Sequence, residues 1–147
     1  MKQRSLPHRV ASRVAPSSRV SRFAPVLLRV SMSLLFLWFG INQIFNPTMF
    51  FGYLPEFILF SDFAGTVVLL NGIFELILGV ALLLGFLTRP VAFVLSLHLL
   101  SIAITLGYND IAVRDLALAL ATLSIVLQGP DQWCLDTWMK KRKHIKR

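Results

Sequence analysis

Four apolar stretches, each close to the length of a bilayer-spanning helix, constrain this chain more than any other feature. They cover about residues 24–46, 64–86, 90–107 and 111–128. A helix needs roughly 20 mostly apolar residues to cross the hydrocarbon core of a membrane. Hydrophobic residues make up 56% of the 147-residue chain, which is too apolar for an ordinary soluble domain. We therefore expect an all-α integral membrane protein that forms a four-helix bundle.

Local signals mark the ends of several of these helices. Pro90 stands in a first turn, where its missing N–H costs nothing. Asn109 is a capping residue before the fourth stretch, and Gly129 with Pro130 closes it. The turn at residues 86–90 is so short that the second and third helices are expected to be antiparallel neighbours.

The charged residues are segregated from the apolar stretches. Net charge is +8, and residues 1–23 and 140–147 each hold six basic residues and no acid. The positive-inside rule then places both ends in the cytoplasm, as an even number of spans requires (N-in, C-in). We divide the chain into a basic cytoplasmic tail (1–23), a transmembrane domain (24–130) and a Trp-containing polybasic cytoplasmic tail (131–147). Both tails are expected to meet anionic lipid headgroups, and a nucleic-acid partner is not expected.

The expected location is the inner (plasma) membrane of a bacterial cell, with several passes. The N-terminal stretch is rich in Arg and Ser and free of acid, which is also typical of an organelle transit peptide. Pro7 and Pro16 would interrupt a long amphipathic helix there, so a disordered cytoplasmic tail is the preferred reading.

Cysteine and histidine usage restricts the chemistry. Cys134 is the only cysteine, so the chain cannot run a dithiol mechanism alone, and we interpret this thiol as a bystander near the membrane surface. Three scattered histidines do not form a metal motif, and no metal site is expected.

The connection at residues 47–63 carries six aromatic residues. It is too short to cross the membrane twice and too apolar to extend into water. Two interpretations stay open: an aromatic anchor along the outer interface, or a lid folded over the bundle. Trp133 and Trp138 fit an aromatic belt at the opposite interface.

Polar residues inside the apolar stretches are the candidate functional residues, because charged groups at this depth are costly and usually face the bundle interior. Glu75 is the twelfth residue of its 23-residue stretch, near the bilayer centre, and Asn71 lies one turn before it on the same face. His98 lies at similar depth, although a hydrogen-bonded packing histidine is an alternative. Arg29 could extend outward to the headgroups or inward to Glu75. We expect these four residues to form one intramembrane polar site, with Glu75 at its centre.

A second, outer polar layer is expected nearer the opposite membrane face. Its candidates are Asn42, Gln43, Arg114 and Asp115. The last two could equally form a surface ion pair of little energetic weight.

Helical spacing supports a polar bundle interior. One stripe of polar and small residues runs along the first stretch at Arg29, Ser33, Phe36, Gly40 and Gln43, and another along the third at His98, Ser101 and Thr105. On the second, Gly72 and Gly79 are seven residues apart, which allows a neighbouring helix to approach closely.

The runs LLRVSMSLLFLWFGINQIFNP, NGIFELILGVALLLGFLTRPVA and LGYNDIAVRDLALAL together resemble the DoxX family of small membrane proteins over about residues 25–130. The resemblance implies a four-helix membrane bundle. Some members are named as subunits of a thiosulfate:quinone oxidoreductase, and others are linked to membrane complexes that handle thiol or oxidative stress. Many members have an acidic–lysine pair at the end of the first helix, where this chain has Asn42 and Gln43.

These observations favour a non-catalytic or accessory subunit of a thiol-, sulfur- or quinone-linked redox system. Its partner would be an oxidoreductase subunit or a second copy of the chain, and quinone is the one cofactor that the resemblance suggests. No self-contained catalytic motif is present, so enzymatic activity stays open. The alternatives are a small-solute permeation unit and an assembly factor for other membrane proteins.

Overall fold

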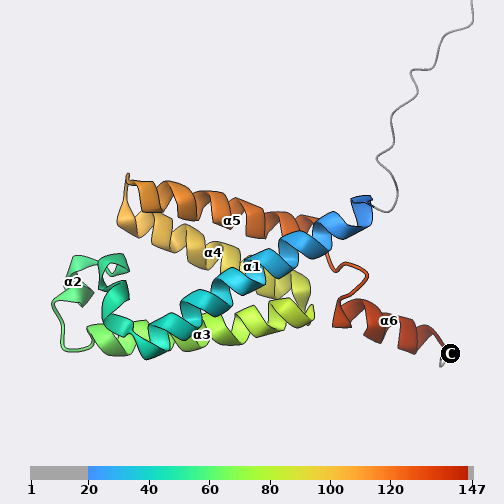
Figure 1. The fold of residues 1–147 in the computed structure, drawn as a ribbon, viewed down its shortest axis with the longest axis horizontal. Helices are drawn as coiled ribbons and strands as arrows, with labels where there is room; N and C mark the ends of the chain where they lie inside the picture. The colour runs from blue at the N-terminus through green and yellow to red at the C-terminus, as the bar shows by residue number, and fades with distance from the viewer. Residues whose placement is uncertain (1–19, 146–147) are drawn as a thin grey trace, which may run out of the picture.

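The computed structural model describes residues 20–145, and within them every regular element is helical (Figure 1). The elements are α1 (Val20–Phe45), the 3₁₀ helix η1 (Pro47–Tyr53), α2 (Glu56–Leu59), α3 (Ala64–Leu84), α4 (Thr88–Leu106), α5 (Asp110–Gln128) and α6 (Leu135–Ile145). The expected all-α membrane fold is confirmed. Most of the expected N-terminal tail, residues 1–19, lies outside the described residues, as do residues 146–147.

The four long helices coincide with the four apolar stretches. Their ends follow the local chemistry: Asn109 accepts a hydrogen bond from the Ala112 N–H at 2.8 Å and caps α5, and Pro90 lies in the first turn of α4. Gly85 ends α3 in the left-handed region, at φ +67°. By length and hydropathy α1, α3 and α4 can each cross a membrane. The fourth span, at α5, and the N-in, C-in orientation stay predictions.

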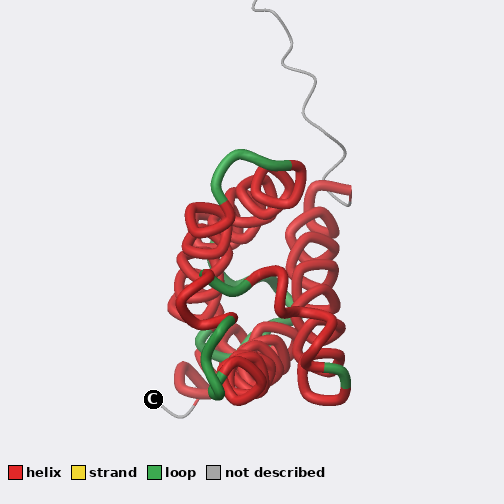
Figure 2. Tube along the Cα trace, turned by 90° about the vertical axis from the view of Figure 1, so that its left-hand side faces the viewer, coloured by secondary structure: helices red, strands yellow, loops and turns green. Residues whose placement is uncertain are grey.

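The long helices are arranged as two antiparallel pairs, in which α1 packs along α3 and α4 along α5 (Figures 1 and 2). The pairs diverge from the short α3–α4 turn, and η1 fills the space between them at the far end (Figure 1). We call the end with the α3–α4 turn and α6 the tail end, and the end with η1 and α2 the loop end. The sequence-adjacent helices α3 and α4 are antiparallel, but they pack less closely than either pair.

Close packing of α1 on α3 depends on glycine. A Cβ atom on Gly40 would come within 2.8 Å of the Gly72 carbonyl oxygen, and one on Gly72 within 2.9 Å of the Gly40 carbonyl oxygen. The two backbones therefore touch at this crossing, which only residues without a side chain permit. A Cβ atom on Gly79 would come within 3.2 Å of the Phe36 side chain and 3.3 Å of the Leu37 side chain of α1, so both Gly72 and Gly79 allow the close approach that their spacing predicts.

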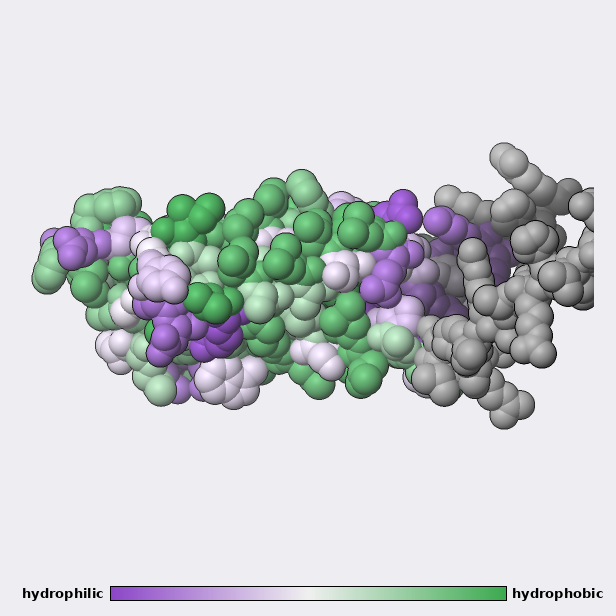
Figure 3. Space-filling model, turned by 90° about the horizontal axis from the view of Figure 1, so that it is seen from above, coloured by the Kyte–Doolittle hydropathy of each residue, from purple (hydrophilic) through white to green (hydrophobic). Residues whose placement is uncertain are grey.

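An apolar core joins the two pairs in the half of the bundle nearer the tail end. It consists of Met32, Phe36, Leu82, Val91, Ala92, Leu95, Leu99, Ala119 and Ile125. Large apolar side chains also cover the outside of the bundle, as at Leu70, Ile77 and Ile104, which are at least 60% exposed. Figure 3 shows this apolar band, with hydrophilic residues gathered toward its two ends. Such a surface is stable against lipid rather than water.

Candidate functional site

Glu75 lies at the centre of a buried polar cluster that three helices supply. Its Oε2 accepts a hydrogen bond from Gln43 Nε2 of α1 at 3.1 Å, and its Oε1 accepts one from Asn71 Nδ2 at 3.0 Å. The same Oε1 lies 2.9 Å from Nε2 of His98 on α4. Asn71 Nδ2 also donates to Gln43 Oε1 at 2.8 Å, which closes the cluster. Sequence reasoning placed Asn71, Glu75 and His98 together, and the structure brings them into contact.

The α1–α3 crossing explains why Gln43 belongs to this cluster. Gln43 and Glu75 each follow a crossing glycine, Gly40 or Gly72, by three residues, and both are buried. Helix periodicity turns both side chains into the same narrow space. The assignment of Gln43 to an outer layer is therefore corrected, because this residue is a hydrogen-bond partner of the Glu75 carboxyl group.

The cluster can hold or transfer a proton. The 2.9 Å contact between Glu75 and His98 allows one proton to reside on either group, while the amides of Gln43 and Asn71 hold the carboxyl group in place. The His98 ring also meets the edge of Phe74 at 5.2 Å between centroids, which fixes its orientation. His98 therefore lies between the buried Glu75 carboxyl group and the less closely packed seam of α3 and α4. The His98 side chain is 15% exposed.

A cavity of about 170 Å³ adjoins the cluster on the loop side. Its polar wall includes Gln43, Asn71, Glu75 and Asp115, and its other walls are mainly apolar and aromatic. Ser101 and Thr105 of α4 line the cavity and are exposed, so the mouth lies along the α3–α4 seam and faces the lipid.

The connection between α1 and α3 covers the loop end of this cavity. Phe50 is buried and packs against Phe39 and Tyr53, each at 5.9 Å between ring centroids. Tyr53, Leu54 and Pro55 line the cavity directly. Of the two interpretations of residues 47–63, the structure shows the covering one for η1. The following aromatic residues Phe57, Phe60 and Phe63 are exposed.

The rest of the outer layer is an ion pair beside the cavity. Arg114 Nε donates to Asp115 Oδ1 at 2.8 Å, and Arg114 Nη2 donates to the Tyr53 hydroxyl at 3.4 Å. The Asp115 side chain is 4% exposed and lines the cavity, so this is not a plain surface pair. Asn42 does not join it: its amide donates to the Trp38 carbonyl of its own helix at 2.7 Å.

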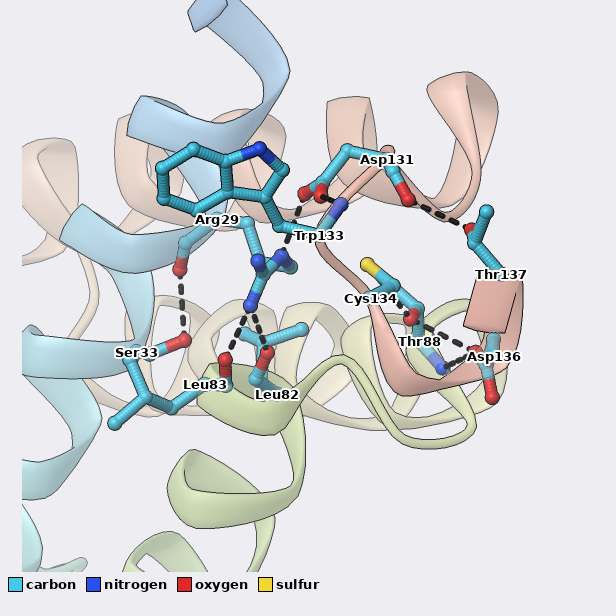
Figure 4. A network of polar contacts seen from close by, with 10 residues as sticks. All are labelled: Arg29, Ser33, Leu82, Leu83, Thr88, Asp131, Trp133, Cys134, Asp136 and Thr137. Atoms are coloured by element: carbon cyan, nitrogen blue, oxygen red, sulfur yellow. Dashed lines mark hydrogen bonds and ion pairs between the residues drawn. The ribbon is translucent and has the colours of Figure 1, made fainter. Parts of the chain in front are cut away.

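Arg29 does not reach Glu75, which corrects the expectation of a single site containing both. Its Nε donates to Asp131 Oδ2 at 2.7 Å, and its Nη1 donates to the carbonyls of Leu82, at 2.9 Å, and Leu83 (Figure 4). Because α3 runs antiparallel to α1, the early part of α1 lies beside the last turn of α3, where the helix no longer continues to supply an N–H four residues on. The Leu82 carbonyl oxygen also accepts a hydrogen bond from the Gly85 N–H at 3.0 Å. The cation therefore binds two turns away from Glu75.

Sequence reasoning missed Asp131 and Asp136, which attach residues 131–137 to the bundle (Figure 4). Asp136 accepts hydrogen bonds from the N–H groups of Leu87 and Thr88 at 2.9 and 2.8 Å, and so caps the start of α4. Leu87 has a positive φ of 49°, which is uncommon for such a residue, and the Asp136 contact holds it there. The available signal was that these two are the only acids after Asp115.

Burial and charge set the ionisation of this attached segment. Burial raises the pKa of the Asp131 carboxyl group, but the hydrogen bonds from Arg29 and the Trp133 N–H, together with the charge of Arg29, outweigh burial and lower the net pKa. Burial also raises the pKa of Asp136, and here the hydrogen bonds from Thr88 and Leu87 and the charge of Lys140 outweigh burial, so this pKa is lowered too. Cys134 is buried between them, against Gly85 and Thr88, and this burial raises the pKa of its thiol. The residue expected to be a bystander is therefore a packing residue, through which the attached segment contacts the bundle.

No group of three His, Cys, Asp or Glu side chains that could hold a metal ion occurs among residues 20–145. Comparison with curated proteins finds no significant match, and comparison with solved structures finds none either. The family model DoxX matches residues 24–108, more than half of the chain, including α1, α3, α4 and the whole Glu75 cluster. Arg114, Asp115 and Asp131 lie beyond the matched range. The chain therefore belongs to the DoxX family.

Proposed function

We propose that this chain is an accessory subunit of a membrane redox system and that it binds the ring of a quinone in the cavity beside Glu75. The observation that carries the proposal is the cavity itself. Its volume of about 170 Å³ is comparable with the ~150 Å³ that accommodates one benzene ring in an engineered protein core. One wall is aromatic and apolar, which suits a ring, and the other is polar, which suits carbonyl oxygens.

The mouth of the cavity fits a ligand that carries a lipid tail. Ser101 and Thr105 mark an opening on the lipid side of the α3–α4 seam, so a ring could enter from the bilayer while its tail stays in lipid. Toward the tail end the apolar core fills the bundle, and Arg29 and Asp131 lie beyond it. The cavity thus opens on one side only and does not continue through the bundle as a pore would, which favours binding over permeation.

A bound quinone would take up two electrons, delivered by a partner subunit, and two protons. In this chain the Glu75–His98 contact could hold one of these protons between Oε1 and Nε2, at the boundary of the cavity, and donate it toward the ring, while the second proton would come from the partner subunit with the electrons. Gln43 and Asn71 keep the carboxyl group oriented during that exchange. This division of labour needs no catalytic motif in the chain itself.

The test is the binding of a short-tailed benzoquinone to the full chain in lipid nanodiscs. Binding is measured as the rise in unfolding temperature that the benzoquinone causes. Glu75→Gln keeps the size of the side chain but removes the exchangeable carboxyl proton. We expect it to weaken quinone binding about fivefold, because the hydrogen bond that the carboxyl proton would donate to a quinone oxygen contributes about 1 kcal/mol. Asp62→Asn, an exposed substitution at the loop end, is the matched control and should bind as the wild type does.

Equal quinone affinity in the Glu75→Gln and wild-type proteins would refute the proposed site. Flux of a weak acid through liposomes that Glu75→Gln abolishes would instead indicate a permeation unit. A Glu75→Gln protein that unfolds at the wild-type temperature excludes loss of structure as the cause of weakened binding.

A further inference from the structure

A groove of about 440 Å³ at the tail end lies between the start of α4 and the basic helix α6. We call it the α4–α6 groove. Its lining comprises Leu87, Arg89, Pro90, Pro130, Met139 and Lys140, together with Asp136. It is distinct from the cavity beside Glu75, which shares no lining residue with it.

Two cations in the groove are available to an anion. Among residues 20–145 the ion pairs involve Arg29, His98 and Arg114, but neither Arg89 nor Lys140. The one acid in the groove, Asp136, is committed to the N–H groups of Leu87 and Thr88 and to the Thr88 hydroxyl. Lys140 is near enough for its charge to help lower the pKa of Asp136, but it forms no ion pair with that carboxylate.

Gly129 provides the space that Arg89 occupies. A Cβ atom at Gly129 would come within 2.9 Å of both Nε and Nη2 of the guanidinium group. The guanidinium therefore lies against bare backbone at the end of α5, which positions it at the groove while its side chain stays exposed.

The groove also lies at the depth where a membrane has its headgroups. The apolar helices α3 and α5 end there, at Leu84 and Gln128, and α4 begins there at Thr88. Trp133 and Trp138 are 66% and 51% exposed on the adjoining segment, and tryptophan is enriched at this membrane level. Arg142 lies over the Trp138 ring at 4.0 Å, which keeps that cation beside an apolar surface.

We propose that the α4–α6 groove binds the headgroup of an anionic phospholipid, with its phosphate between Arg89 and Lys140. The apolar residues Leu87, Pro90, Pro130 and Met139 cover the glycerol and the first part of the acyl chains. A free phosphate ion would match the two cations and leave these apolar walls in water, so a lipid is the better match. A lipid bound in this groove would contact both α4 and α6 and so link α6 to the bundle. The proposal does not depend on quinone binding.

The test is native mass spectrometry of the full chain released from nanodiscs that contain equal amounts of phosphatidylglycerol and phosphatidylcholine. The wild type should retain one phosphatidylglycerol. Arg89→Gln combined with Lys140→Gln should lower its retention about 30-fold, at about fivefold for each basic residue near anionic lipid.

Lys141→Gln combined with Arg142→Gln is the matched control, because it also removes two positive charges from the tail end but changes no residue that lines the groove. It should reduce retention less than about fivefold. Equal losses in the two double variants would overturn the proposal in favour of general attraction to the membrane, and so would retention of phosphatidylcholine and phosphatidylglycerol alike. Slow labelling of Cys134 in both variants verifies that residues 131–137 remain docked.

Discussion

Replacing Asp131 by Asn should release the C-terminal segment from the bundle. The substitution removes the anionic partner of Arg29, whose side chain and that of Asp131 are each only 4% exposed. Removing one partner of a buried ion pair costs about 3–5 kcal/mol. Arg29 retains the carbonyls of Leu82 and Leu83, so we take the lower limit, about 3 kcal/mol.

Cys134 provides the assay, because it is the only cysteine and is buried where residues 131–137 dock on the bundle. Labelling by a maleimide requires local opening, so its rate follows the free energy of that opening. A loss of about 3 kcal/mol should accelerate labelling about 100-fold in protein held in lipid nanodiscs. Fluorescent maleimide and gel densitometry suffice to measure this change.

Two further variants make the reasoning refutable. Thr137→Val removes only the hydrogen bond from the Thr137 hydroxyl to the Asp131 carbonyl, and should accelerate labelling about fivefold, since such a bond contributes about 1 kcal/mol. Asp62→Asn, at the other end of the bundle, should leave the rate unchanged. A labelling rate in Asp131→Asn within twofold of the wild type would show that the Arg29 ion pair does not hold the segment.

Three other predictions concern packing, pH and the cavity cover. Gly40→Ala should lower the free energy of unfolding by about 1–3 kcal/mol through overpacking against Gly72, whereas Gly65→Ala, which meets no atom within 4 Å, should not; thermal unfolding in detergent compares the two. Because the pKa of Asp131 is lowered in the folded protein, its contribution to docking is present above the usual aspartate pKa of about 3.8 and is lost as pH falls through the lowered value. At such low pH the rate at which Cys134 reacts with a pyridyl disulfide, divided by the rate of a free thiol at the same pH, should therefore rise. Phe50→Ala should cost about 3–5 kcal/mol by emptying a buried aromatic site, and quinone binding that is unaffected in a still-folded variant would contradict the role of η1 as a cover.

The four long helices and the faces that they bury follow from the amino-acid sequence alone. Apolar length, proline, glycine and capping residues act within a few residues along the chain, so the spans near residues 24, 64, 90 and 111 could be located without a fold. The same periodicity put Glu75 and Asn71 on one face and made His98 a credible neighbour at equal depth.

The pairing of the buried polar groups, by contrast, depends on how the helices pack in three dimensions. The crossing at Gly40 and Gly72 brings Gln43 into the Glu75 cluster, and the antiparallel offset of α1 and α3 places Arg29 beside the carbonyls in the last turn of α3. Asp131 is 102 residues from Arg29 along the chain, beyond the reach of any local pattern. The cavity exists because two closely packed pairs diverge from one turn, and such an angle depends on side-chain contacts between helices, which helical periodicity alone does not specify.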